Sequence, residues 1–240
     1  MKSTQSLFLK LFLFIGLFHC SCKRPISGEG ELIKESRKIT NFNNIVLNIS
    51  AHVTILVADT NSLTLVSQEN IVENIEIKNK NDKLIIQSDR ILKSDKPIAI
   101  LITCTSLRGI ELNGSGKIII INQYSTSKVN FTINGSGKIE THLNATEIKS
   151  KINGSGEMNF SGEVQRLKIQ INGSGKINAQ ELSASLCDID IHGSGKAYLS
   201  VKDNLDISIV GSGDVIYAGE PIIKSSVTGK GKINSINKEK

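Results

Sequence analysis

Apolar residues alternate with polar ones along most of the chain, with the period of two that is typical of a β-strand with one buried face. From residue 109 onward the alternation repeats regularly around a glycine triplet. Two positions before each triplet the residue is always aliphatic: Leu112, Ile133, Ile152, Ile171, Ile191, Ile209 and Val227. Four positions after the first glycine of each triplet stand Ile118, Ile139, Met158, Ile177, Ala197, Val215 and Ile233. We therefore expect inward-facing columns on both sides of a repeated corner.

The triplet occurs seven times, six times as Gly-Ser-Gly and once as Gly229-Lys230-Gly231. Successive first glycines are 21, 19, 19, 20, 18 and 18 residues apart. A repeat of this length predicts stacked coils, because one coil cannot bury its apolar face without a neighbour. We expect each coil to contain two strands, a corner at the triplet and a variable return segment. The predicted fold class is all-β, a parallel β-solenoid with about seven regular coils.

The glycines of the triplets are interpreted as structural turn residues, because a sharp corner requires positive φ and little side-chain bulk. They are Gly114, Gly116, Gly135, Gly137, Gly154, Gly156, Gly173, Gly175, Gly193, Gly195, Gly211 and Gly213. Asparagine precedes the first four triplets, as Asn113, Asn134, Asn153 and Asn172, and its amide is suited to ladders along a stack.

Residues 37–108 carry the same alternation in a less regular form. The apolar runs cover residues 45–49, 53–57, 62–66, 75–77, 83–87 and 98–102. We expect irregular coils that cap one end of the solenoid, with a single helical turn at 68–74. Residues 37–236 are predicted to form one domain, irregular over 37–108 and regular over 109–236, followed by a polar tail at 237–240.

Residues 1–22 resemble an export signal, with two lysines and an apolar run that ends shortly before a pair of cysteines. The run is about a dozen residues long, too short for a membrane span. A cysteine at this point resembles the lipidated first residue of mature bacterial lipoproteins. Cys22 is the expected lipidation site because Ser21 before it is small, and Cys20 is the alternative. Residues 23–36 are then expected to be a short tether to the outer membrane, on a face that the sequence leaves open.

The formal net charge is +6, and it falls to +4 if the two lysines of the export signal are removed. The residue that follows each triplet forms a row of five lysines and two acids: Lys117, Lys138, Glu157, Lys176, Lys196, Asp214 and Lys232. The lysines form a candidate binding stripe for an anionic polymer. The alternative is a solvated ladder in which the acids relieve repulsion between like charges, and we favour this second interpretation.

The best candidate for catalysis is a group of aspartates, Asp188, Asp190, Asp206 and Asp214, with Lys168 one coil away. Polysaccharide-cleaving sites need such carboxylates on one outer face of successive coils. The first two aspartates alternate with apolar residues, however, as an ordinary solvated face does. We therefore predict no catalytic residue.

No metal, cofactor or nucleic-acid site is predicted. The four histidines are too far apart in sequence to suggest a ligand pair. The Gly-Ser-Gly-Lys strings lack the helix that a phosphate-binding loop requires, and an export signal argues against nucleic acid as a partner. Cys104 and Cys187 fall in inward columns about four coils apart, roughly 19 Å, so we expect two buried free thiols.

The ordered landmarks of the chain resemble the head GIN, DUF2807-type adhesin domains of Bacteroidetes. Besides the triplets, these landmarks are Phe42-Asn43-Asn44-Ile45, Val53-Thr54-Ile55, Ile75-Glu76-Ile77, Asp82-Lys83-Leu84-Ile85-Ile86 and Leu107. The resemblance implies a single-stranded, right-handed parallel β-helix without catalytic residues, in an exported and often lipidated protein with an adhesive role.

Three functions are consistent with this sequence. We predict a non-enzymatic, envelope-anchored solenoid that binds a glycan or a protein through its repetitive outer faces. The alternatives are a polysaccharide-active enzyme that uses the aspartates and a structural spacer that associates with itself. The ligand and the oligomeric state stay open.

Overall fold

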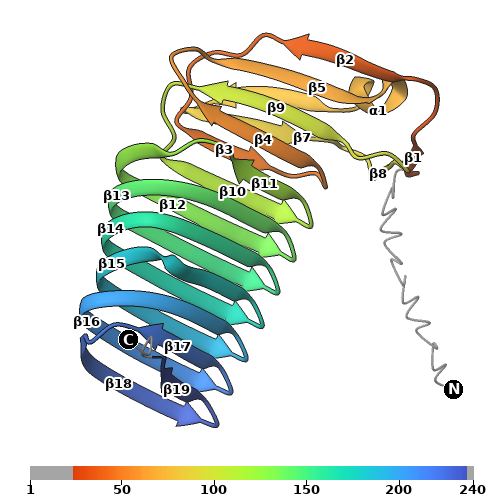
Figure 1. Ribbon diagram of the computed structural model, residues 1–240. Coiled ribbons are helices and arrows are strands. Elements are labelled where there is room, and N and C mark those ends of the chain that lie inside the picture. Colours follow the sequence, from red (N-terminus) through yellow and green to blue (C-terminus); the bar gives the residue numbers. More distant parts are fainter. Residues whose placement is uncertain (1–23, 237–240) are drawn as a thin grey trace, which may run out of the picture.

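The computed structural model describes residues 24–236, which form a long β-solenoid joined to a broader sheet at its N-terminal end (Figure 1). The strands of the solenoid are β10 (Gly109–Gly114), β11 (Lys117–Ile120), β12 (Tyr124–Gly135), β13 (Lys138–Gly154), β14 (Glu157–Gly173), β15 (Lys176–Gly193), β16 (Lys196–Gly211), β17 (Asp214–Ala218), β18 (Ile222–Gly229) and β19 (Lys232–Ser235). Neighbouring coils pair in parallel, with each first glycine opposite the next, as Gly154 is opposite Gly173. This arrangement confirms the predicted parallel β-solenoid.

Each of the coils formed by β13, β14, β15 and β16 is one long, bent strand. β13 and β14 have 17 residues each and β15 has 18, so each runs from one triplet to the next without interruption. The bend opposite the triplet keeps its pairing, with Leu143 opposite Gly162. The expectation of two strands and a separate return segment holds for the coil of β11 and β12 and for that of β17 and β18. It was wrong for the coils of β13 to β16, where one strand continues through the bend.

The predicted apolar columns fill the interior. Ile133, Ile152 and Ile171 are completely buried, and the rings of Phe131 and Phe160 pack with their centroids 5.2 Å apart. The two predicted thiols, Cys104 and Cys187, are buried and free. Burial raises the pKa of the Cys104 thiol to about 11 and also raises the pKa of Cys187, since a thiolate is poorly solvated in an apolar interior. Both thiols are therefore packing residues.

The two glycines of a triplet are required for different reasons. The first has positive φ in every copy, from +115° at Gly114 to +132° at Gly135. The second lacks positive φ but has no space for a side chain: a Cβ on Gly156 would lie 2.6 Å from Cγ2 of Ile133 in the preceding coil. The predicted need for positive φ therefore applies only to the first glycine, and the second lets the corner pack directly on the core.

The asparagine ladder expected beside the triplets is present. Each side-chain amide donates to the carbonyl oxygen of the asparagine one coil earlier, over 2.7 Å from Asn134 to Asn113 and 2.8 Å from Asn172 to Asn153. The ladder also extends to Asn48, which accepts from Asn113 over 2.7 Å. Residues 48–51 thus form a corner of the same kind without the glycine triplet that would reveal it in the sequence.

The N-terminal part forms coils only in places. Its elements are β2 (Leu32–Arg37), β3 (Asn44–Leu47), β4 (His52–Val57), β5 (Ser62–Gln68), α1 (Glu69–Glu73), β6 (Glu76–Lys80), β7 (Lys83–Gln87) and β9 (Ala99–Cys104). β3 and β4 stack in parallel on β10 and β11, while β7 and β9 stack in parallel on β3 and β4. The coil of β3 and β4 therefore lies between two coils that come later in the chain.

The remaining N-terminal strands are antiparallel, which corrects the expectation of irregular coils throughout 37–108. β2 pairs with β5, β5 with β9, and β6 with β7. The last of these is a hairpin whose two turn residues, Asn81 and Asp82, have φ of 50° and 59°. Such a turn reverses the chain at once and so requires antiparallel pairing. The predicted helical turn is confirmed as α1.

The segment expected to be a tether belongs to the folded body. β1 (Ile26–Ser27) pairs in parallel with β8 (Leu92–Lys93), and β2 begins at Leu32. Ile26 is buried against the core, which is the physical reason why this part of 23–36 is ordered. The predicted export signal at 1–22, with Cys22, and the polar tail at 237–240 lie outside the described residues.

Candidate binding surfaces of the solenoid

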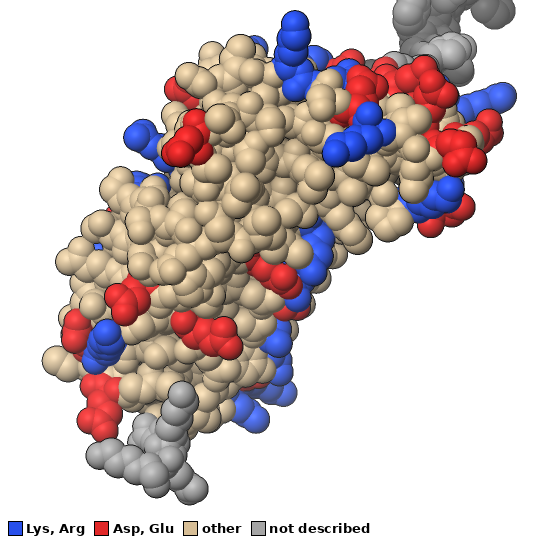
Figure 2. Space-filling view, turned by 45° about the horizontal axis from the view of Figure 1, so that its top comes forward, with Lys and Arg blue, Asp and Glu red and all other residues tan. Residues whose placement is uncertain are grey.

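The residues after the triplets stand in register on successive coils and form one row along the solenoid. Figure 2 shows one long edge of the molecule with mainly basic side chains and a few acidic ones among them. Lys138 Nζ lies 2.9 Å from Glu140 and 3.1 Å from Glu157, and Lys117 Nζ lies 3.7 Å from Glu140. The Glu140 carboxylate raises the pKa of Lys138, and Lys138 in turn lowers the pKa of Glu140. Two predicted stripe lysines are therefore matched by carboxylates of the same surface.

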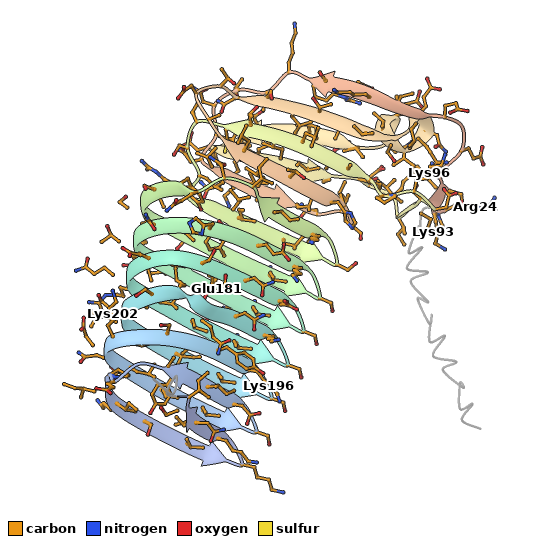
Figure 3. All side chains as sticks on the ribbon, viewed as in Figure 1. Arg24, Lys93, Lys96, Glu181, Lys196 and Lys202 are labelled. Atoms are coloured by element: carbon orange, nitrogen blue, oxygen red, sulfur yellow. The ribbon has the colours of Figure 1, made fainter. Side chains whose placement is uncertain are left out.

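Two further lysines of the row, Lys196 and Lys176, also have partners. Lys196, at the corner edge in Figure 3, lies 3.2 Å from Asp214, and the ammonium of Lys176 lies 5.0 Å from the ring centroid of Tyr198. Lys232 stands on β19 in the last described coil. A stripe in which most cations have a partner is a weak attractor for a polyanion, which favours the interpretation as a solvated ladder.

A different surface is shaped by an irregularity in β15. The coil from Gly173 to Gly193 spans 20 residues, one more than the coil before it. The extra residue appears as a shift in register, because Asn159 is opposite Asn178 whereas Ser161 is opposite Glu181. Bulges of this kind redirect side chains at the surface of a sheet.

Beside this shift lies a groove of about 440 Å³ across β13, β14 and β15, which we call the His142 groove. Its apolar floor includes Ile120 and Phe160, both buried. Its polar lining consists of Glu140, Thr141, His142, Asn159, Ser161, Asn178, Gln180 and Glu181. Figure 3 shows Glu181 on the outer side of the central coils.

The polar groups of the His142 groove form short hydrogen bonds between coils. Nδ1 of His142 lies 2.8 Å from the hydroxyl of Ser161, and the amide of Asn178 donates to Asn159 over 2.6 Å. Glu181 is the register neighbour of Ser161 and not of His142. A nucleophilic serine would need the carboxylate behind the histidine, so this order does not match a catalytic triad. The groove offers amide, hydroxyl, imidazole and carboxylate groups over an apolar floor, a lining suited to ligands that carry hydroxyl groups.

The candidate aspartates are only partly brought together. Asp188 and Asp206 are direct neighbours on successive coils, flanked in the same row by Lys168 and Lys224. They line a shallow groove of about 330 Å³ together with Asp190. Asp214 lies beyond the corner, where it pairs with Lys196, and so does not join the others. A cation thus stands on each side of the carboxylate pair, and Arg166 lies 3.8 Å from Asp188, as expected of a solvated face with compensated charge.

The histidine, cysteine and acidic side chains of residues 24–236 form no group of three or more that could hold a metal ion. Over the same residues, no helix has both the length and the apolar character needed to cross a membrane.

The His142 groove was not identified from the sequence. The 20-residue spacing was the available signal, but it marks only the coil and not the position of the extra residue.

Comparison with known proteins agrees with this architecture. A family model described as "Putative auto-transporter adhesin, head GIN domain" (DUF2807) matches residues 41–221. The chain belongs to this family. The match begins before β3 and ends just before β18, so the head GIN domain comprises most of the N-terminal sheet and the solenoid up to its last coil.

Solved structures of similar proteins have the same fold. A "putative adhesin" from Bacteroides fragilis is 25% identical, with a TM-score of 0.83 over 88% of this chain and 100% of that one. A "putative lipid binding protein" from Parabacteroides distasonis is 24% identical, with a TM-score of 0.74 over 89% of this chain and 100% of that one. A "putative adhesin" from Parabacteroides merdae is 18% identical, with a TM-score of 0.76 over 89% of this chain and 100% of that one. No curated protein matches the sequence.

Proposed function

We propose that this protein is a non-enzymatic, envelope-anchored adhesin that binds a glycan in the His142 groove. Membership of an adhesin family supports the general role and an extracytoplasmic location. The observation that carries the specific proposal is the lining of the groove, where amide, hydroxyl, imidazole and carboxylate groups surround an apolar floor that includes Phe160 and Ile120. A sugar has both an apolar face and a rim of hydroxyl groups, and this combination is complementary to it.

The repetition of the outer surface determines the mode of binding that we propose. Polar positions recur from coil to coil at the inter-strand spacing of about 4.8 Å. A polymeric ligand that lies along the solenoid axis can therefore make several similar contacts in series. Many weak contacts of this kind give strong overall attachment, as adhesion to a surface requires.

The binding test is a glycan panel probed with the mature protein and with two groove variants. We expect His142→Ala and Asn178→Ala each to weaken binding of the retained glycans about tenfold, since each removes hydrogen-bonding groups from the groove. Ser208→Ala, on the aspartate face, is the matched control and should leave binding unchanged. Equal binding by all variants would show that the groove is not the site. Release of sugar fragments that is abolished by Asp206→Asn would show instead that the protein is an enzyme.

The second part of the proposal is the anchor at Cys22. Its support is the export signal and the lipoprotein-like cysteine at the end of that signal. Palmitate labelling should be lost in Cys22→Ala and kept in Cys20→Ala. Protease treatment of intact cells then tests the exposed location that adhesion requires, because a protein that survives the treatment would act in the periplasm.

A second candidate function, self-association, is favoured by the last described coil. Ile223 and Val227 of β18 stand in inward columns but are 40% and 41% exposed. If two copies paired their β18 strands antiparallel about Ser225, Ile223 would face the partner's Val227 and no like charges would be opposed. Light scattering over a range of concentrations tests this function. A dimer that Val227→Lys dissociates would support it, and a strict monomer would exclude it.

A further inference from the structure

We propose that the loop of residues 88–97 contacts the phospholipid headgroups of the membrane into which the lipid on Cys22 inserts. Ile91 is the residue of this loop that enters the interface. The folded body would then stand directly on the bilayer, in a fixed orientation and without a flexible spacer. This inference rests on the proposed lipidation of Cys22 and adds to it a defined surface of contact. It starts from the segment that was expected to be a tether.

The N-terminal segment is hydrogen-bonded to the folded body from its first described residue, Arg24. The guanidinium of Arg90 donates to the carbonyl oxygen of Arg24 over 3.1 Å from Nε and 2.9 Å from Nη2. The backbone N–H of Ile26 donates to Ile91 over 2.9 Å, and that of Gly28 donates to Lys93 over 2.7 Å. These bonds are the parallel pairing of β1 with β8 and its extension on both sides. These four bonds, which we call the clamp, all go to the loop of residues 88–97. Asn70 of α1 also holds the segment, because its amide donates to the carbonyl oxygen of Ser27 over 2.7 Å and its side-chain oxygen accepts from the backbone N–H of Glu29 over 3.0 Å.

This clamp leaves little chain between the anchor and the body. Cys22 precedes Arg24 by two residues, which span at most about 7 Å when fully extended. The headgroup layer on one side of a bilayer is itself roughly 5–7 Å thick. With its acyl chains in the hydrocarbon, a lipidated Cys22 therefore holds Arg24, and the loop clamped to it, at the membrane surface.

The surface at this point is suited to an interface between water and lipid. Ile91 is 59% exposed although it is a large aliphatic residue, and Arg90 and Lys93 flank it. Arg24, Lys93 and Lys96 gather where the described chain begins (Figure 3). Long basic side chains beside an exposed apolar residue can reach phosphate groups while the apolar residue enters the interface.

Charge alone does not account for the proposed contact. The same loop contains Asp89 and Asp95, and Glu29 and Glu31 lie in the neighbouring turn. Each basic residue near an anionic bilayer is attracted only weakly, so a surface of mixed charge would bind weakly without an anchor. The contact with the membrane is therefore determined mainly by the short connection to Cys22. The exposed Ile91 and the basic side chains beside it determine which face of the protein is turned toward the bilayer.

Tryptophan fluorescence tests the contact directly, because the chain contains no tryptophan. Full-length protein carrying Ile91→Trp would be purified in its lipidated form, with the lipid on Cys22 verified by mass, and placed in phosphatidylethanolamine–phosphatidylglycerol vesicles with brominated acyl chains. We expect emission shifted to the blue and quenched about twofold relative to vesicles without bromine. The matched control is Ile222→Trp, at a site 78% exposed in the last described coil, which should not be quenched.

Two further measurements separate this inference from the proposed anchor. Insertion of a ten-residue Gly-Ser segment after Lys23 should remove the quenching in Ile91→Trp, because the longer connection lets the body leave the surface. Protein without lipid on either Cys20 or Cys22 would overturn the proposed anchor. Lipidated protein in which Ile91→Trp is quenched no more than Ile222→Trp would overturn the membrane contact while the anchor stands.

Discussion

The two ends of the solenoid differ in how they finish a stack of coils. At the N-terminal end, α1 contributes Ile71 and Val72, both fully buried, and the antiparallel strand β2 pairs alongside β5. At the other end, β18 continues the parallel register of the coils, but all its residues are exposed. In the column before the triplet, Ile209 is 1% exposed and Val227, one coil later, is 41% exposed.

This difference shows that a repeat position becomes part of the core only when another element covers it. Each coil covers the inward-facing side chains of the coil next to it. The last described coil has no such neighbour on one side, so its inward-facing apolar side chains stay partly exposed. At the N-terminal end the repeat is replaced by a helical turn and antiparallel strands, and these elements cover the apolar side chains of the end coil. Matched substitutions at the two ends and in the middle of the stack test this contrast.

The largest effect is expected from a charge placed in the middle of the apolar column. Ile171→Asp should lower the free energy of unfolding by about 4 kcal/mol or more, because it buries an unpaired carboxylate. Val227→Asp makes the same change at the same repeat position in the exposed last coil, and it should cost about 0.5 kcal/mol or less. Urea unfolding followed by circular dichroism measures both. Similar losses in the two variants would mean that β18 is covered in solution.

A smaller effect is expected from truncation at the two ends. Ile71→Ala in α1 should cost about 3 kcal/mol, since it leaves a cavity under the cap. Ile222→Ala, in the exposed strand β18, should cost less than about 0.5 kcal/mol. Hydrogen exchange resolved along the chain should also show faster exchange in β2 and β5 after the first change. If exchange there stayed at the wild-type rate, the closing role of α1 would be contradicted.

Glycine substitutions test where the regular coils meet the irregular part. Gly154→Ala should cost about 3 kcal/mol, because φ is +126° and the new Cβ would lie 2.5 Å from the carbonyl oxygen of Gly135. Gly114→Ala should cost only about 1 kcal/mol, since its φ of +115° is strained for alanine but no atom lies within 4 Å of the new Cβ. Thermal unfolding of both variants measures the two losses of stability. Equal losses would mean that backbone strain, and not the contact of the new Cβ with the neighbouring coil, determines the destabilisation.

The smallest effect concerns the paired charges of the lysine row. Lys138 holds the pKa of Glu140 below its ordinary value, so this carboxylate stabilises the fold above its unfolded pKa and loses that contribution as the pH falls through its lowered folded pKa. Lys138, whose pKa is raised, loses its contribution as the pH rises through that raised value. Glu140→Gln should therefore cost about 0.5 kcal/mol near neutral pH and nothing in strong acid. A melting-temperature difference from wild type that persists below about pH 2 would contradict this assignment.

Much of the local structure could be predicted from the alternation of residues. The run at 83–87 is β7 with the same bounds, and the single helical turn within 68–74 is α1. The continuous strand through the bend of β13 to β16 could not be predicted, because a bend that keeps its hydrogen bonds has the same composition as a loop. The position of β3 and β4 between two later coils could not be predicted either, because residues 48–51 form a corner without the glycines that mark the other corners.

The candidate surfaces were predictable to different degrees. The acids within the lysine row, such as Glu157, indicated an internally compensated ladder, and the structure adds Glu140 from a neighbouring row. The pairing of His142 with Ser161 depends on which residues of two coils stand opposite each other. An extra residue can be accommodated at many points of a coil, so only the packed stack determines where the groove opens.

The stack of coils follows from the amino-acid sequence, because its period, its apolar columns and its paired glycines are satisfied by coils that bury one another. The order of the first coils, the antiparallel closure of the N-terminal end and the clamp of residues 24–28 to the loop around Ile91 become visible only in the folded chain. The physical reason is that periodic burial is a local property of the chain, whereas the partner of an irregular strand depends on contacts between residues far apart in sequence.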